Sequence, residues 1–153
     1  GSDYQAHVLV GRSADGYLYV DADLRRQTVT EMVQTGCELV KAFKPDGFAI
    51  ETNQFQQLLR PEYERIGRAM GLMTLPIYPV DNYVKKAVRI RRLTPWLSRQ
   101  RLRFKEGSKG AGLVVQQMRD FTGEPKDTDD GPDALEVAIR LMAQLWSGRA
   151  TKR

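Results

Sequence analysis

The acidic segment before the last predicted helix holds the residues best suited to chemistry. It reads Asp129-Asp130-Gly131-Pro132-Asp133-Ala134-Leu135, with two adjacent carboxylates ahead of a proline that marks a helix start. In one interpretation the acids are structural, with Asp130 capping the helix and Asp133 complementing its dipole. That leaves the repulsion among Asp127, Asp129 and their neighbours without a balancing cation. Mg²⁺ and Mn²⁺ prefer carboxylate oxygens, so the segment predicts a divalent metal site.

Glu51 is a second candidate because it lies at the end of a short apolar strand, Phe48-Ala49-Ile50-Glu51-Thr52. Ligands collect at the carboxyl edge of open α/β sheets. A solvated acid at a strand end is the alternative interpretation. The only cysteine, Cys37, and the only histidine, His7, exclude disulfides, cysteine-based zinc sites and multi-histidine metal sites. We expect Cys37 to be buried on the apolar face of a helix.

Charge is strongly segregated along the chain, whose net charge is +5. Ten of the 24 basic residues fall between Lys85 and Lys109, whereas seven acids fall between Asp120 and Glu136. A basic block suits a polyanion and an acidic cluster suits cations, which favours a nucleic-acid enzyme over two solvated charged faces. The best candidates for contacting DNA phosphates are Lys85, Lys86, Arg89, Arg91 and Arg92. A solvated basic face is the alternative.

The elements that must position these residues alternate between strand and helix. Residues 7–12 and 17–24 are β-rich and flank the turn Ser13-Ala14-Asp15-Gly16, which predicts a hairpin. Thr28 and Glu31 form a capping box that opens a helix. We then expect a strand at 48–52, a helix at 54–70 divided at Pro61, and an edge strand at 75–80. The second half should contain a basic helix broken at Thr94-Pro95, a strand at 101–104 and a helix near 113–121. The last expected element is a helix with an apolar stripe from Leu135 to Trp146.

This order of elements predicts an α/β fold with a mixed sheet flanked by helices. The length of 153 residues suits one domain, and we expect it to cover residues 1–153. No apolar run approaches the roughly 20 residues that a membrane span needs, so we expect no membrane partner. No secretion signal is recognisable, and Gly1-Ser2 is consistent with a cloning scar.

Four motifs in order resemble the nuclease domain of phage terminase large subunits. They are Asp3-Tyr4-Gln5-Ala6 with Asp15-Gly16-Tyr17-Leu18-Tyr19, Glu51-Thr52-Asn53-Gln54-Phe55-Gln56, Lys85-Lys86-Ala87-Val88-Arg89-Ile90, and the acidic segment from Asp129 to Leu135. The resemblance implies a ribonuclease-H-like fold, related to Holliday-junction resolvases. It implies a metal-dependent endonuclease that cleaves concatemeric duplex DNA with two Mg²⁺ or Mn²⁺ ions. Carried over, Glu51 and either Asp129 or Asp130 become catalytic metal ligands, while Asp133 becomes a helix-start residue or a partner of a ligand.

The resemblance also implies partners and a place of action. Lys85, Lys86, Arg89 and Arg92 would bind double-stranded DNA. The other expected partners are an N-terminal ATPase domain of the same full-length protein, the portal and the small terminase subunit. The expected place of action is the host cytoplasm during virus assembly. The phosphate-cradling pattern of an ATPase is absent here, because Gly107-Ser108-Lys109-Gly110 lacks its spacing. The alternatives are a non-catalytic DNA-binding or assembly module, and a resolvase or transposase of the same fold.

One departure from the family pattern concerns the N-terminus. These nucleases begin with a strand that carries the first metal-binding aspartate, and no such strand precedes Asp3 here. Asp3 matches a later aspartate of the hairpin, so we do not assign it to the metal. We therefore expect this chain alone to show feeble, manganese-favoured or absent cleavage, and residues upstream of Asp3 to restore it.

Overall fold

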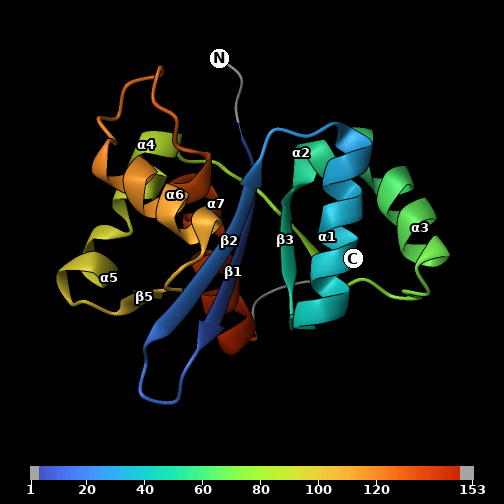
Figure 1. Ribbon diagram of the computed structural model, residues 1–153, viewed down its shortest axis with the longest axis horizontal. Helices are drawn as coiled ribbons and strands as arrows, with labels where there is room; N and C mark the ends of the chain where they lie inside the picture. The colour runs from blue at the N-terminus through green and yellow to red at the C-terminus, as the bar shows by residue number, and fades with distance from the viewer. Residues whose placement is uncertain (1–3, 149–153) are drawn as a thin grey trace. The chain divides into compact units, whose positions relative to one another are not determined.

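The computed structural model describes residues 4–148, which form a mixed α/β protein (Figure 1). The described chain divides into two compact units, each built from two separate segments. The first unit contains residues 4–26 and 84–139, and the second contains residues 27–83 and 140–148. The candidate residues are divided between them, with the acidic and basic segments in the first unit and Glu51 in the second.

The first unit contains a three-stranded mixed sheet. Strand β1 (Gln5–Arg12) pairs antiparallel with β2 (Leu18–Arg25), which pairs in parallel with β5 (Leu102–Phe104). The predicted hairpin is confirmed, and Figure 1 shows its two long strands side by side. The Ser13 amide donates to the Tyr17 carbonyl at 2.9 Å, and Gly16 has a φ of 88°, a value that favours glycine.

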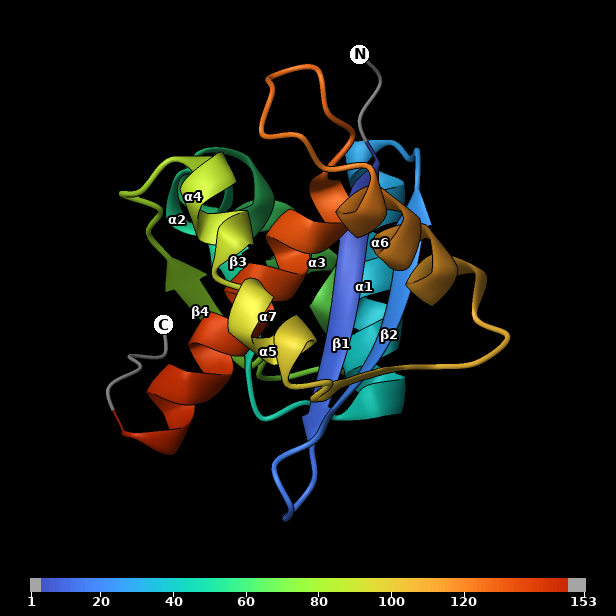
Figure 2. The same cartoon turned by 90° about the vertical axis from the view of Figure 1, so that its left-hand side faces the viewer.

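Helices cover one face of this sheet and enclose the core of the unit. They are α4 (Lys86–Arg91), α5 (Thr94–Ser98), α6 (Lys109–Arg119) and the first part of α7 (Asp130–Trp146) (Figure 2). Their apolar side chains meet those of alternate strand residues. The buried core residues are Val20, Leu24, Ile90, Leu93, Val114 and Leu135.

The predicted break of the basic helix at Thr94-Pro95 is confirmed, because α4 ends at Arg91 and α5 begins at Thr94. Pro95 lies in the first turn of α5, where its missing N–H costs nothing. The predicted start of the next helix, in contrast, was wrong. Helix α6 begins before the predicted Leu113, because the Ser108 hydroxyl accepts a hydrogen bond from the Ala111 amide at 3.1 Å. Gly110 lets this helix approach β2, since a Cβ there would lie 1.8 Å from the Ala22 carbonyl oxygen.

The second unit contains two parallel strands, β3 (Phe48–Glu51) and β4 (Ile77–Val80), in the register Phe48↔Ile77 to Glu51↔Val80. Helix α1 (Val29–Phe43) opens with the predicted capping box. The Glu31 amide donates to the Thr28 hydroxyl at 3.2 Å, and the Thr28 amide donates to the Glu31 carboxylate at 3.3 Å. The predicted burial of Cys37 is also confirmed, and it raises the pKa of the thiol to about 11.

The predicted division at Pro61 appears as a change of helix type. Helix α2 (Thr52–Gln54) continues into a π-helical turn, Phe55–Leu59, and then into α3 (Arg60–Ala69). Pro61 lies in the first turn of α3, and a residue without an amide N–H favours such a shift in hydrogen bonding. The buried core of this unit consists of Val33, Cys37, Ile50, Phe55, Leu59, Tyr63, Ile66 and Ile77.

The predicted apolar stripe of α7 extends one residue too far, because Trp146, the last residue of the helix, is 75% exposed. Among residues 4–148, no helix is both long and apolar enough to span a bilayer.

Candidate functional site

The acidic segment is held in place at the start of α7. The carbonyl of Asp129 accepts the first helical hydrogen bond, from the Asp133 amide at 3.0 Å. The Asp130 carboxylate accepts from the Tyr4 amide at 2.9 Å. The Gly131 amide donates to the buried Gln117 side chain of α6 at 2.8 Å. Asp130 is therefore held by the N-terminal segment, and the following residue, Gly131, by α6.

Helix α4 lies against this start of α7 and supplies positive charge. The Lys86 ammonium is 3.3 Å from the Asp129 carboxylate and 3.9 Å from that of Asp133. The Arg89 guanidinium is 2.6 Å from the Asp133 carboxylate and 3.7 Å from that of Glu136. The Arg92 guanidinium reaches Glu136 at 4.0 Å. We call this set of six residues the ion-pair ladder: Lys86, Arg89 and Arg92 with Asp129, Asp133 and Glu136.

Helical periodicity explains the ladder. Its bases recur every three residues along α4 and its acids every three or four, so each set occupies one face of its helix. This spacing is present in the sequence, but it does not predict the pairing, and the sequence marks Glu136 only as part of the acidic cluster. Figure 2 shows α4 beside the N-terminal part of α7.

Burial divides the ladder into an inner rung and two outer ones. The side chains of Arg89 and Glu136 are 7% and 5% exposed, whereas those of Lys86 and Arg92 are 45% and 49% exposed. The Arg89 Nε also donates to the Val84 carbonyl at 2.9 Å. The structure thus places Arg89 inside the unit and not on a surface where a DNA phosphate would reach it. We correct its assignment from DNA contact to packing α4 against α7.

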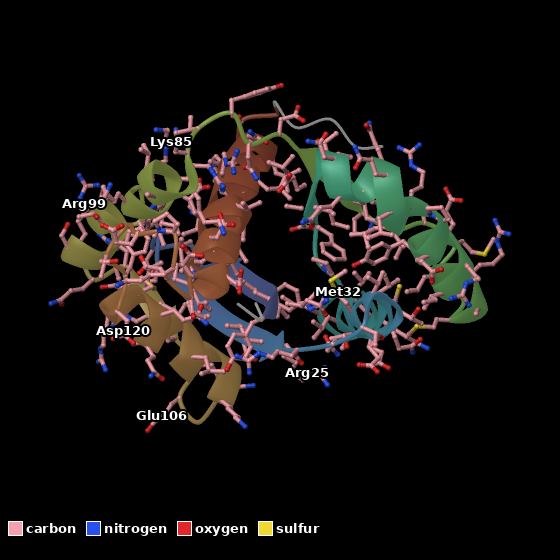
Figure 3. All side chains as sticks on the ribbon, turned by 90° about the horizontal axis from the view of Figure 1, so that it is seen from above. Arg25, Met32, Lys85, Arg99, Glu106 and Asp120 are labelled. Carbon is pink, nitrogen blue, oxygen red and sulfur yellow. The ribbon has the colours of Figure 1, made fainter. Side chains whose placement is uncertain are left out.

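The side chain of Lys86 is partly exposed to solvent and lies beside the carboxylates of Asp129 and Asp133. Partial burial disfavours its charged form, but the carboxylates of Asp129 and Asp133 outweigh that effect and raise the pKa of Lys86. It is therefore an ammonium ion at neutral pH, lying against one of the predicted metal ligands. Lys85, one residue earlier, is exposed at the start of α4, on the outer side of the ribbon (Figure 3).

The structure shows how these acids are balanced without an added cation, which corrects the expectation from their mutual repulsion. Asp127 accepts hydrogen bonds from the Thr122 hydroxyl at 2.7 Å, the Thr122 amide at 2.9 Å and the Gly123 amide at 2.8 Å. The bond from the Thr122 hydroxyl is the main reason that the pKa of Asp127 is lowered. Lys86 and Arg89 supply the positive charge for the other acids, so electrostatic balance alone does not require a metal.

Glu51 lies where the sequence predicted, at the carboxyl end of β3 and exposed. It immediately precedes α2, and its side chain makes no capping hydrogen bond there. Within residues 4–148, no three His, Cys, Asp or Glu side chains are grouped so as to hold a metal ion. Metal binding by Glu51, Asp129 and Asp130 therefore stays a prediction. Asp3 lies outside the described residues.

A scan against protein-family models gives no match, and a search of curated proteins gives no significant match. The likeness to terminase nucleases thus depends on the order and residues of the motifs.

Proposed function

We propose that the chain is a ribonuclease-H-like nuclease domain of a terminase large subunit, which cleaves duplex DNA with bound Mg²⁺ or Mn²⁺. The observation that best supports this is the adjacent pair Asp129–Asp130 at the start of α7, with a basic helix beside it. In this proposal the packaging ATPase is a separate domain of the same protein.

The donor chemistry of the pair suits the proposed metals. Asp129 and Asp130 offer hard carboxylate oxygens at the start of α7. When bound, two such ions would stabilise the attacking and leaving oxygens of an in-line displacement. The chain itself contributes the Tyr4 amide, which donates a hydrogen bond to the Asp130 carboxylate, and the Lys86 ammonium, which balances the charge of Asp129.

The DNA backbone would be bound by the exposed part of the basic segment. Lys85 is exposed and Lys86 and Arg92 are about half exposed, so their charged ends can reach phosphates. Arg89 contributes indirectly, by packing α4 against α7. Phosphate contacts of this kind add affinity without sequence preference.

A plasmid-nicking assay tests the proposal. With protein in excess over supercoiled DNA and Mn²⁺ present, we expect slow nicking by the wild-type chain, and none in EDTA. The variant Asp129→Asn with Asp130→Asn should not nick, although asparagine retains an oxygen that can accept from the Tyr4 amide. Glu124→Gln, an exposed acid in the preceding loop, is the matched control and should nick like the wild type. Equal nicking by all three proteins would contradict the site.

A non-catalytic DNA-binding or assembly module is the second candidate, and the ion-pair ladder favours it. The acids already have protein cations as partners, as expected if they serve only to hold α4 in place. Duplex binding in EDTA combined with no nicking under any metal would establish this alternative. Nicking that depends on Asp129 and Asp130 would exclude it.

A further inference from the structure

The outward face of the three-stranded sheet carries two tyrosines beside two arginines. Because Leu18 and Val20 are buried on the inner face, Tyr19 between them points outward and is 55% exposed. Its register partner on β5 is Arg103. Tyr17 precedes β2, and the amide of the next residue, Leu18, donates to the Arg101 carbonyl at 2.9 Å. We call Tyr17, Tyr19, Arg101 and Arg103 the tyrosine–arginine patch.

Both arginines lie on the ring of Tyr17. The Cζ atoms of Arg101 and Arg103 are 4.9 Å and 4.6 Å from its centroid, within the range of a cation–π interaction. Arg101 also donates to the Asp15 carbonyl of the hairpin turn at 3.3 Å. Two guanidinium groups are therefore held close together by one aromatic ring, one of them with a second anchor in the turn.

This patch differs from the ion-pair ladder in its charge balance. Within the part of the chain that the structure describes, neither Arg101 nor Arg103 lies within 4.0 Å of a carboxylate. The Asp15 carboxylate is the acid that Arg101 influences, since the pKa of Asp15 is lowered mainly by the hydrogen bond from Ser13 and to a smaller degree by the charge of Arg101. Arg89, by contrast, lies close to two carboxylates. Arg99, at the end of α5, adds a further exposed positive charge in the segment that leads into β5 (Figure 3).

The chemistry of a stacked guanidinium identifies the kind of partner. Stacking covers its faces but leaves its N–H edges available, and those edges match the two oxygens of a phosphate. Because the ring restricts both side chains, less rotamer entropy is lost when they bind. The ring of Tyr17 already contacts two cations, so stacking on an unpaired base is less suited to it than phosphate binding beside it.

We propose that the tyrosine–arginine patch is a second docking surface for the phosphate backbone of duplex DNA, distinct from the basic helix α4. The identification of the polyanion as DNA rests on the proposed function. The assignment of the patch depends on the contacts of Tyr17 with Arg101 and Arg103, and on the absence of a carboxylate within 4.0 Å of either arginine among residues 4–148.

Fluorescence anisotropy with a labelled duplex of mixed sequence, in EDTA, tests this docking surface without cleavage. The variant Arg101→Ala with Arg103→Ala should lower the slope of log affinity against log salt by about 1.8, since each neutralised phosphate accounts for about 0.9. The control, Arg65→Ala with Arg119→Ala, removes the same charge from exposed positions elsewhere and should leave the slope unchanged.

Two further variants separate docking from folding. Arg101→Lys with Arg103→Lys keeps both charges and should keep the slope. Tyr17→Leu also keeps the charges but removes the ring, so affinity should fall by about two- to ten-fold for each arginine whose rotamers the ring no longer restricts, with the slope retained. Thermal melts of all variants check that the fold is intact.

Equal slopes for the patch and control variants, or no duplex binding by the wild-type chain in EDTA, would overturn the docking surface. Slope changes as expected would support it even if the plasmid assay showed no nicking, because only the nuclease assignment would then fail.

Discussion

Replacing Arg89 by methionine should strongly destabilise the first unit. The substitution keeps the apolar stem but removes a guanidinium that is 7% exposed and lies 2.6 Å from the Asp133 carboxylate. Breaking a buried ion pair by removing one partner costs about 3–5 kcal/mol. We expect about 3 kcal/mol, the lower end, because Asp133 is 24% exposed and lies near the positive end of the α7 dipole. For a chain of this length that corresponds to a fall in melting temperature of roughly 6–12 °C.

Thermal and urea unfolding followed by circular dichroism measure this effect. Lys86→Met is the matched control, because it removes a charge from the same ladder at a side chain that is 45% exposed. Its cost should be about 0–1 kcal/mol. Adding Glu136→Leu to Arg89→Met should recover part of the stability, since an apolar side chain then replaces a buried carboxylate without its main cation. If Lys86→Met destabilised the protein as much as Arg89→Met, the division into inner and outer rungs would be wrong.

Three other predictions concern positions outside the ladder. Gly110→Ala should lower the free energy of unfolding by about 3 kcal/mol, because its Cβ would overlap the Ala22 carbonyl. Gly112→Ala, whose Cβ would have nothing within 4 Å, should stabilise α6 by about 0.5–1 kcal/mol. Thermal melts in which Gly110→Ala were the more stable variant would contradict the close approach of α6 to β2. Burial lowers the pKa of His7 below its ordinary value of 6.5, so its contribution to stability is present above pH 6.5 and is lost as the pH falls below it. In urea titrations, the unfolding free energies of the wild type and His7→Gln should therefore converge as the pH falls below 6.5. A difference between the two proteins that stayed constant with pH would argue against this. Burial raises the pKa of Cys37 to about 11, so at pH 8 its thiol should react with Ellman's reagent only as fast as the fold opens, and immediate reaction would show that it is accessible.

Several features of the fold could be predicted because their signals are local. The hairpin follows from alternating apolar residues on either side of a turn that contains Gly16. The start of α1 follows from Thr28 and Glu31, which bond to each other's backbone. The irregular helix before Pro61 follows from the proline's missing amide. Each of these depends on residues within a few positions of one another, so the neighbouring sequence is sufficient.

The candidate site could be predicted only as a set of residues. Segregated charge marked the two segments, and the end of β3 marked Glu51, but no sequence pattern showed which charges would meet. A base repeated every three residues has the same spacing on a solvated helix face and in a buried ladder. The sequence therefore predicts Arg89 as a DNA contact, although it packs against Asp133, 44 positions later in the chain.

The tyrosine–arginine patch shows the same limit. Tyr17 and Arg101 are far apart in the sequence, and they meet only because β5 pairs in parallel with β2. Amino-acid types and local spacing set which side chains are charged, which are apolar and where helices and strands begin. Whether a given charge faces solvent, an acid or an aromatic ring is decided by the packing of distant segments, because the energy of a charge depends on what surrounds it.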